Sequence, residues 1–443
     1  MRLHKPLLLL LTTLTVLLFT ACGALESPAP TAQFTPTAEV IPPASLAPIS
    51  SATPTEVAIR GTISLWHSLE AGQMPALLRQ IAAFQELYPN VYFDVLYVPR
   101  VDLRAAFEEA SRTGSSPTIL IGSGEWGADW FAQGFVADLD DLAGSDLLAA
   151  LNPAAVAAAR YQENLIGLPY WIEGVVLYRN RLVIPKAPET FDELVLLSQQ
   201  ATSGEVFGAY LERSFFFSGA HLSGLGGALF DKDGAPAFNS PEGLEWLDLL
   251  RAFEKAGPTD FFTDSDLNLF KEGKVGFLID GTWSRAALAE AIGAENLAID
   301  PWPIIGRGAL SGFLRSENIY LSARALEENN AVSWMFSEYL LRPAAQSALS
   351  EVGLIPAISG SPVNPVAGEL AISEALIAQA MRALVSAVPY PHGPATGLYT
   401  TSLDIALRSV FEGAASPAQA LQEAETAIRE GLMPLQANPT PSP

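Results

Sequence analysis

The chain has 443 residues, of which 49% are hydrophobic, and its acidic residues outnumber the basic ones by 48 to 25. The resulting formal charge of −23 at pH 7 opposes binding to a phosphate backbone, so we expect no nucleic acid as a partner. The residues between 57 and 436 are numerous and apolar enough to build two or three domains with large cores.

The first 21 residues are predicted to be a secretory signal peptide. Arg2 and Lys5 precede an apolar run over residues 6–19, which is too short to cross about 30 Å of hydrocarbon. The run closes on the letters LFTAC, which resemble the lipobox of bacterial lipoproteins and imply that Cys22 carries the lipid. Cys22 is the only cysteine, and lipidation would account for a lone exported thiol. The alternative is an incidental cysteine beside an ordinary cleavage site.

Residues 22–56 are predicted to form a tether. They are dominated by Pro, Thr, Ala and Ser, and they hold too few large apolar side chains to offset the entropy of ordering. The Pro-rich tail at residues 437–443 is expected to be loose for the same reason. No long apolar run follows the signal peptide, so we expect the lipid to be the membrane anchor, on the outer face of the cell membrane.

Strands and helices alternate in the first part of the folded region. Strands are predicted at residues 62–66, 91–98 and 118–121. Between them, apolar residues recur at helical spacing over residues 77–88 and 103–110. This alternation predicts a mostly parallel sheet with helices on both faces.

A second α/β unit is predicted further along the chain. A buried strand over residues 274–280 precedes a helix over residues 284–292. Capping patterns mark three further helix starts: Thr190 with Glu193, Ser240 before Pro241, and Ser416 with Gln419.

The order of several motifs resembles the extracellular solute-binding proteins of the maltose and oligosaccharide importer family. The strongest are LIGLPYWIEGVVLYRN at residues 165–180, PETFDEL at 188–194 and FKEGKVGFLIDGTWS at 270–284. The resemblance covers nearly the whole chain after the tether. It implies a two-lobe α/β fold of the type II periplasmic-binding-protein kind, with a ligand cleft between the lobes and closure about hinge crossings.

The resemblance also implies where the lobes begin and end. The crossings are expected near residues 172–174, 300–304 and 325–329. The N-terminal lobe is then expected to comprise residues 58–172 and 303–328, and the C-terminal lobe residues 173–302 and 329–436.

A sugar ring presents apolar faces and a rim of hydroxyls, so its site needs flat aromatic surfaces beside polar groups. The resemblance implies that Trp283, in the motif at residues 270–284, is the best supported stacking residue, and its place after the end of a predicted strand favours the same role. The remaining candidates come from the resemblance and from strand ends and crossings: Trp66, His67, Trp126, Asp129, Trp171, Glu173, Phe216 and Tyr399. The alternative for each tryptophan is that it packs in a core.

Arg315 is a further candidate, either as a guanidinium fork for an anionic group on the ligand or as a surface arginine. His67 and His221 lack neighbouring His or Cys residues at the spacing of metal ligands, so we expect no metal and no cofactor.

The resemblance implies a monomeric binding protein that delivers a carbohydrate-like solute to the permease subunits of an ABC transporter. One alternative is a secreted, lipid-anchored glycoside hydrolase, which needs two carboxyl groups about 5 to 10 Å apart. Common hydrolase and phosphate-binding motifs are not found in the sequence, and we expect no enzyme. A ligand-presenting sensor is the other alternative.

Overall fold

The computed structural model describes residues 59–232, 234–261, 263–327, 331–360, 369–393 and 395–437. The chain divides into two compact units, Met1–Glu56 and Val57–Pro443, and every described residue belongs to the second unit. The expected signal peptide, Cys22, the tether and residues 438–443 lie outside the described residues. None of the helices in the described ranges combines the length and the apolar character that a membrane crossing needs.

The first lobe is built on three parallel strands in the order β2 (Asn90–Tyr97), β1 (Arg60–His67), β3 (Ile119–Ser123). Helices α1 (Met74–Leu87) and α2 (Arg100–Arg112) connect them. α1 buries Leu77, Ile81 and Phe84, which its helical periodicity places on one face. The strand and helix alternation predicted for this part of the chain is therefore confirmed.

Two long strands continue this sheet away from β3. β13 (Phe313–Leu321) lies antiparallel to both β3 and β6 (Leu168–Asn180). β6 pairs with β13 as far as Gly174 and with β9 (Val275–Gly281) from Val175 onward. A Cβ atom on Gly174 would lie 2.7 Å from the carbonyl oxygen of Phe313, so glycine permits this close approach. β6 thus changes its partner beside residues 172–174, where we expected a crossing.

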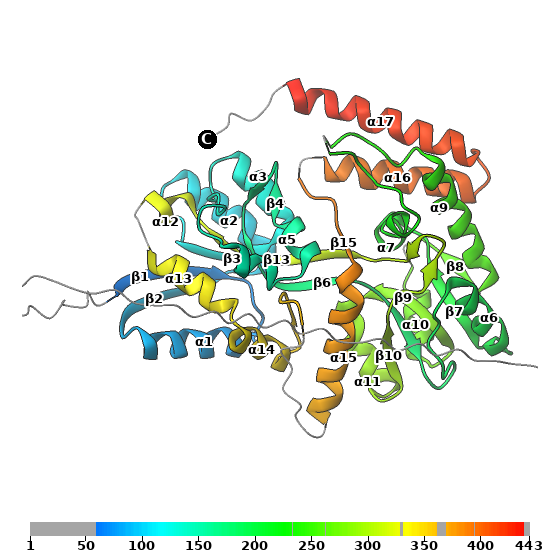
Figure 1. Ribbon diagram of the computed structural model, residues 1–443, viewed down its shortest axis with the longest axis horizontal. Coiled ribbons are helices and arrows are strands. Elements are labelled where there is room, and N and C mark those ends of the chain that lie inside the picture. The colour runs from blue at the N-terminus through cyan, green and yellow to red at the C-terminus, as the bar shows by residue number, and fades with distance from the viewer. Residues whose placement is uncertain are drawn as a thin grey trace, which may run out of the picture. The chain divides into compact units, whose positions relative to one another are not determined.

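The second lobe extends the sheet through β9, β7 (Phe207–Glu212) and β8 (Thr259–Asp260), which pair in parallel. β10 (Leu297–Asp300) lies antiparallel to the far half of β6. Figure 1 shows β6 and β13 between the strands and helices of the two lobes.

The three predicted capping residues begin helices of this lobe. The side-chain oxygens of Thr190, Ser240 and Ser416 accept backbone N–H groups at the third following residue. They precede α6 (Phe191–Ala201), α9 (Pro241–Ala252) and α17 (Pro417–Ala437). α17 packs along α16 (Thr396–Phe411) and contacts α9.

The other elements are shorter or lie on the surface of these two lobes. The helices are α3 (Gly127–Ala132), α4 (Ser145–Ala149), α5 (Pro153–Ala158), α7 (Phe215–Ser218), α8 (His221–Gly224), α10 (Ser265–Lys271), α11 (Arg285–Ile292), α12 (Ala323–Glu327), α13 (Ala331–Leu340), α14 (Pro343–Glu351) and α15 (Glu369–Ala383). The strands are β4 (Arg160–Tyr161), β5 (Asn164–Leu165), β11 (Ile304–Ile305), β12 (Gly308–Ala309), β14 (Ile355–Pro356) and β15 (Val388–Pro389). The 3₁₀ turns are Gly124–Trp126, Phe253–Lys255, Thr282–Ser284 and Leu384–Ser386.

The second lobe was expected to resume at residue 329, but α13 and α14, which follow this position, contact the first lobe. α13 packs against β1, and α14 packs against α1, so both belong beside the first lobe. The ring centre of Phe336 lies 5.1 Å from that of Phe84 and 4.8 Å from that of Phe93. Burial of these apolar rings against one another explains why α13 lies beside the first lobe. The chain reaches the second lobe later, where α16 contacts α7.

Candidate ligand-binding site

A polar pocket lies where the first lobe meets the two crossing strands. Its lining residues come from the start of α2, the end of β3, the following 3₁₀ turn and the centres of β6 and β13: Arg100, Ser123, Glu125, Glu173, Arg315, Ser316 and Glu317. Glu173 and Arg315 stand opposite each other in the pairing of β6 with β13. Residues on paired strands are held at fixed separation, so the backbone itself positions these two side chains.

The Arg315 guanidinium is surrounded by carboxylates and aromatic rings. Its Nη1 donates to Glu125 Oε1 at 3.3 Å, and its Nη2 lies 3.9 Å from Glu173 Oε2. Its Cζ lies 5.1 Å from the ring centre of Trp283 and 5.3 Å from that of Phe216, which are cation–π distances. Arg315 therefore connects Glu125 of the first lobe with two rings of the second.

The second lobe contributes an aromatic wall to this site. Phe216 at the start of α7 packs against Trp283 with 5.9 Å between ring centres and against Tyr390 with 5.2 Å. Trp283 follows the carboxyl end of β9 and is 42% exposed. A Cβ atom on Gly281 would lie 2.0 Å from the Trp283 ring, so the ring lies against the backbone there. An exposed indole at a strand's carboxyl end is positioned for ligand contact.

Glu317 and Arg100 form an ion pair at the pocket, in which Glu317 is buried and the Arg100 side chain is 55% exposed. Glu317 is 6% exposed, and its Oε1 forms an ion pair with Arg100. Burial raises the pKa of Glu317 to about 7, against the opposite effect of the Arg100 guanidinium. The other oxygen, Oε2, is buried without a hydrogen-bond partner among the described residues.

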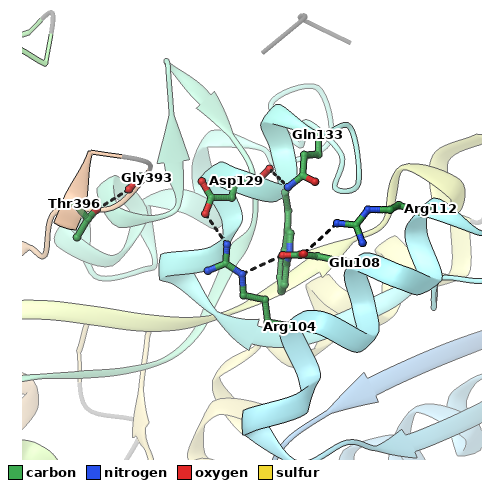
Figure 2. Close-up of polar contacts among 8 residues, drawn as sticks. Arg104, Glu108, Arg112, Asp129, Gln133, Gly393 and Thr396 are labelled. Atoms are coloured by element: carbon green, nitrogen blue, oxygen red, sulfur yellow. Dashed lines mark hydrogen bonds and ion pairs between the residues drawn. The ribbon is translucent and has the colours of Figure 1, made fainter. Parts of the chain in front are cut away.

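Trp126 and Asp129 are not among the residues that line the pocket. Trp126 is half-buried, with the Arg100 guanidinium 5.7 Å from its ring centre. The Asp129 carboxylate accepts from Arg104 Nη2 at 2.7 Å (Figure 2). Arg104 also donates to Glu108, which in turn accepts from Arg112, so Asp129 is part of a salt-bridge network on the first lobe (Figure 2).

Three other candidate residues lie in packed surroundings. His67 is 1% exposed, burial lowers its pKa, and its Nδ1 accepts the Leu69 N–H. Trp66 packs into the small cluster that contains Trp130, and Trp171 is 6% exposed in the main core.

Tyr399 is 3% exposed in the core of the second lobe, so its expected position as a cleft platform is wrong. Its hydroxyl donates to the carbonyl of Gly234, and its ring packs on Phe230.

In the described ranges, no group of three His, Cys, Asp or Glu side chains is arranged to hold a metal ion. His221 is fully buried, and burial lowers its pKa to about 4, so it is a neutral core residue.

Comparison with known proteins shows the family. The profile of the bacterial extracellular solute-binding proteins matches residues 79–370, which is more than half of the chain. The chain belongs to this family. As an extracellular solute-binding protein it acts outside the cytoplasm, and its function is to bind a solute.

Curated relatives of this solute-binding protein are about one quarter identical to it over the aligned residues. The maltotriose-binding protein of Pyrococcus abyssi is 24% identical over 313 residues, covering 68% of this chain and 67% of the relative. The galactooligosaccharide-binding protein of Bacillus subtilis is 26% identical over 333 residues, covering 71% and 77%.

Solved structures confirm the two-lobe type II fold. The cyclic alpha-maltosyl-1,6-maltose binding protein of Arthrobacter globiformis matches with a TM-score of 0.73 at 19% identity, covering 84% of this chain and 99% of that protein. A cyclo/maltodextrin-binding protein complexed with maltotetraose matches with a TM-score of 0.72 at 21% identity, covering 85% and 98%.

The structure of this solute-binding protein thus brings together four of the sequence candidates: Glu173, Phe216, Trp283 and Arg315. The lining residues that the sequence analysis missed are Arg100, Ser123, Glu125, Ser316 and Glu317, and Tyr390 completes the aromatic wall. Glu125 could have been found, because it follows a buried strand just as Trp283 does. Glu317 could not be found in this way, because it lies within a strand and not directly after one.

Proposed function

We propose that this solute-binding protein holds a sugar or short oligosaccharide between the aromatic wall and the polar pocket. The observation that carries the proposal is the exposed face of Trp283 beside the carboxylates of Glu125 and Glu173. An indole packs on the apolar face of a pyranose, while carboxylates accept hydrogen bonds from its hydroxyls.

The relatives support the sugar class and favour binding over catalysis. The relatives compared above are named for binding maltotriose and galactooligosaccharide, and the solved structures for binding maltosyl and maltodextrin ligands. We therefore propose that the protein is not an enzyme. We also propose that it acts as a monomer. It delivers its ligand to the permease subunits of an ABC importer.

We also propose that the protein is attached to the outer face of the cell membrane through lipid on Cys22. The support is the LFTAC sequence at the end of the signal-like segment. With residues 22–56 as a tether, the solute-binding unit would stand away from the membrane surface.

Calorimetric titration tests the binding function directly. The full chain is titrated with maltotriose, a galactooligosaccharide and non-sugar solutes such as amino acids, and each ligand is then recovered and analysed by mass spectrometry. Saturable binding of a sugar that is recovered intact is the expected result. Binding of none of the sugars, or accumulation of a shortened sugar with time, would contradict the proposal.

A further inference from the structure

The charged groups of the pocket are unequal in number. The lining contains two arginines and three glutamates, and the ion pair of Arg100 with the buried Glu317 accounts for one of each. The remaining charged groups of the lining are one guanidinium, Arg315, and the carboxylates of Glu125 and Glu173. With every group ionised, the formal charge of the whole lining is −1.

Arg315 is poorly placed to bind an anionic ligand. Its fork already donates to Glu125 and faces Glu173, and the rings of Trp283 and Phe216 lie near its Cζ. An anionic group arriving at this fork would come within the range of both carboxylates, and like charges at such distances repel. The anionic ligand considered from the sequence is thus disfavoured by the neighbours of Arg315.

Glu173 is the carboxylate with free acceptor capacity. Among the described residues its side chain has one polar contact, the 3.9 Å ion pair with Arg315, which is longer than a hydrogen bond. The side chain is 39% exposed and stands on the crossing strand next to the aromatic wall. Carboxylates and aromatic faces together are the surroundings that stabilise an ammonium group.

We infer that this cleft selects a sugar that carries a protonated amine, with Glu173 as the residue that accepts the ammonium group. The inference rests on the proposed sugar-binding function and narrows its substrate class to amino sugars. A protonated amine in place of a hydroxyl gains a charge-assisted hydrogen bond to Glu173 and offsets the net negative charge of the lining.

The test compares three ligands that differ in one group: maltotriose, its 6-amino-6-deoxy analogue and its 6-carboxylate analogue. Calorimetry at about pH 8 keeps a primary amine protonated and keeps Glu317 ionised, whose pKa is about 7. We expect the amino analogue to bind about 10-fold more tightly than maltotriose and the carboxylate analogue to bind more weakly. The ratio of amino to neutral affinity should fall toward one in Glu173→Gln.

The control is Asp248→Asn, which removes one negative charge from an exposed position on α9 and should leave that ratio unchanged. Equal binding of the amino and neutral sugars, tighter binding of the carboxylate analogue, or a ratio unaffected by Glu173→Gln would overturn the inference while leaving the sugar-binding function intact. Failure of all three ligands and of other oligosaccharides to bind would instead refute the function itself.

Discussion

Replacing Trp283 with alanine tests whether the exposed indole is a ligand contact. The ring is 42% exposed, so about 100 Å² of a side chain of about 250 Å² is available to a ligand. At about 25 cal/mol per Å², a sugar that covers most of this area gains about 2 kcal/mol. The affinity of Trp283→Ala for its sugar should therefore fall about 30-fold, as measured by calorimetric titration.

Trp246 provides the matched control in the same lobe. It is fully buried and its Nε1 donates to the carbonyl of Ser218, so Trp246→Ala should cost about 3 to 5 kcal/mol of folding stability. Thermal melting of both variants should show a smaller fall in melting temperature for Trp283→Ala than for Trp246→Ala. If Trp283→Ala binds sugar like the wild type while its melting temperature falls as far as that of Trp246→Ala, Trp283 is a packing residue and the site is misplaced.

Three further predictions concern the anchor, the lobes and the buried carboxyl. Cys22→Ser should move the protein from the membrane to the soluble fraction, and retention at the membrane would argue against lipidation. Small-angle scattering should give a smaller radius of gyration with bound sugar, and an unchanged radius would exclude closure of the lobes. The pKa of Glu317 is raised from 4.5 to about 7, so its stabilising contribution is present below about pH 4.5 and is lost as pH rises to about 7. As the pH rises across this range, the melting temperature of Glu317→Gln should fall less than that of the wild type. Identical pH profiles of the two proteins would contradict the raised pKa of Glu317.

The sequence predicted those parts of the molecule that local patterns determine. The caps at Thr190, Ser240 and Ser416 depend on short side-chain to backbone bonds, and all three were correct. The position of Trp283 followed from the end of its strand.

Features that depend on distant contacts were harder to predict. Tyr399 follows loops of uncertain length, so its position could not be aligned reliably from the sequence. Its hydroxyl donates to the carbonyl of Gly234, which lies far away in the sequence. The position of α13 beside β1 depends on apolar contacts between Phe336 and rings at Phe84 and Phe93, which no pattern in residues 325–329 reveals. The pairing of Glu173 with Arg315 joins residues more than a hundred positions apart, and the sequence alone does not give that register.

The path of β6 limits how this protein can be divided into fragments. Residues up to Gly174 pair with β13, whereas residues from Val175 onward pair with β9. A cut on either side of β6 would leave one fragment without a central strand and with an open row of backbone N–H and C=O groups. Such unpaired edges recruit other chains, so that fragment should not be obtainable as a well-behaved soluble protein. Reporter insertions for a sugar sensor therefore belong in surface loops that leave β6 and β13 whole.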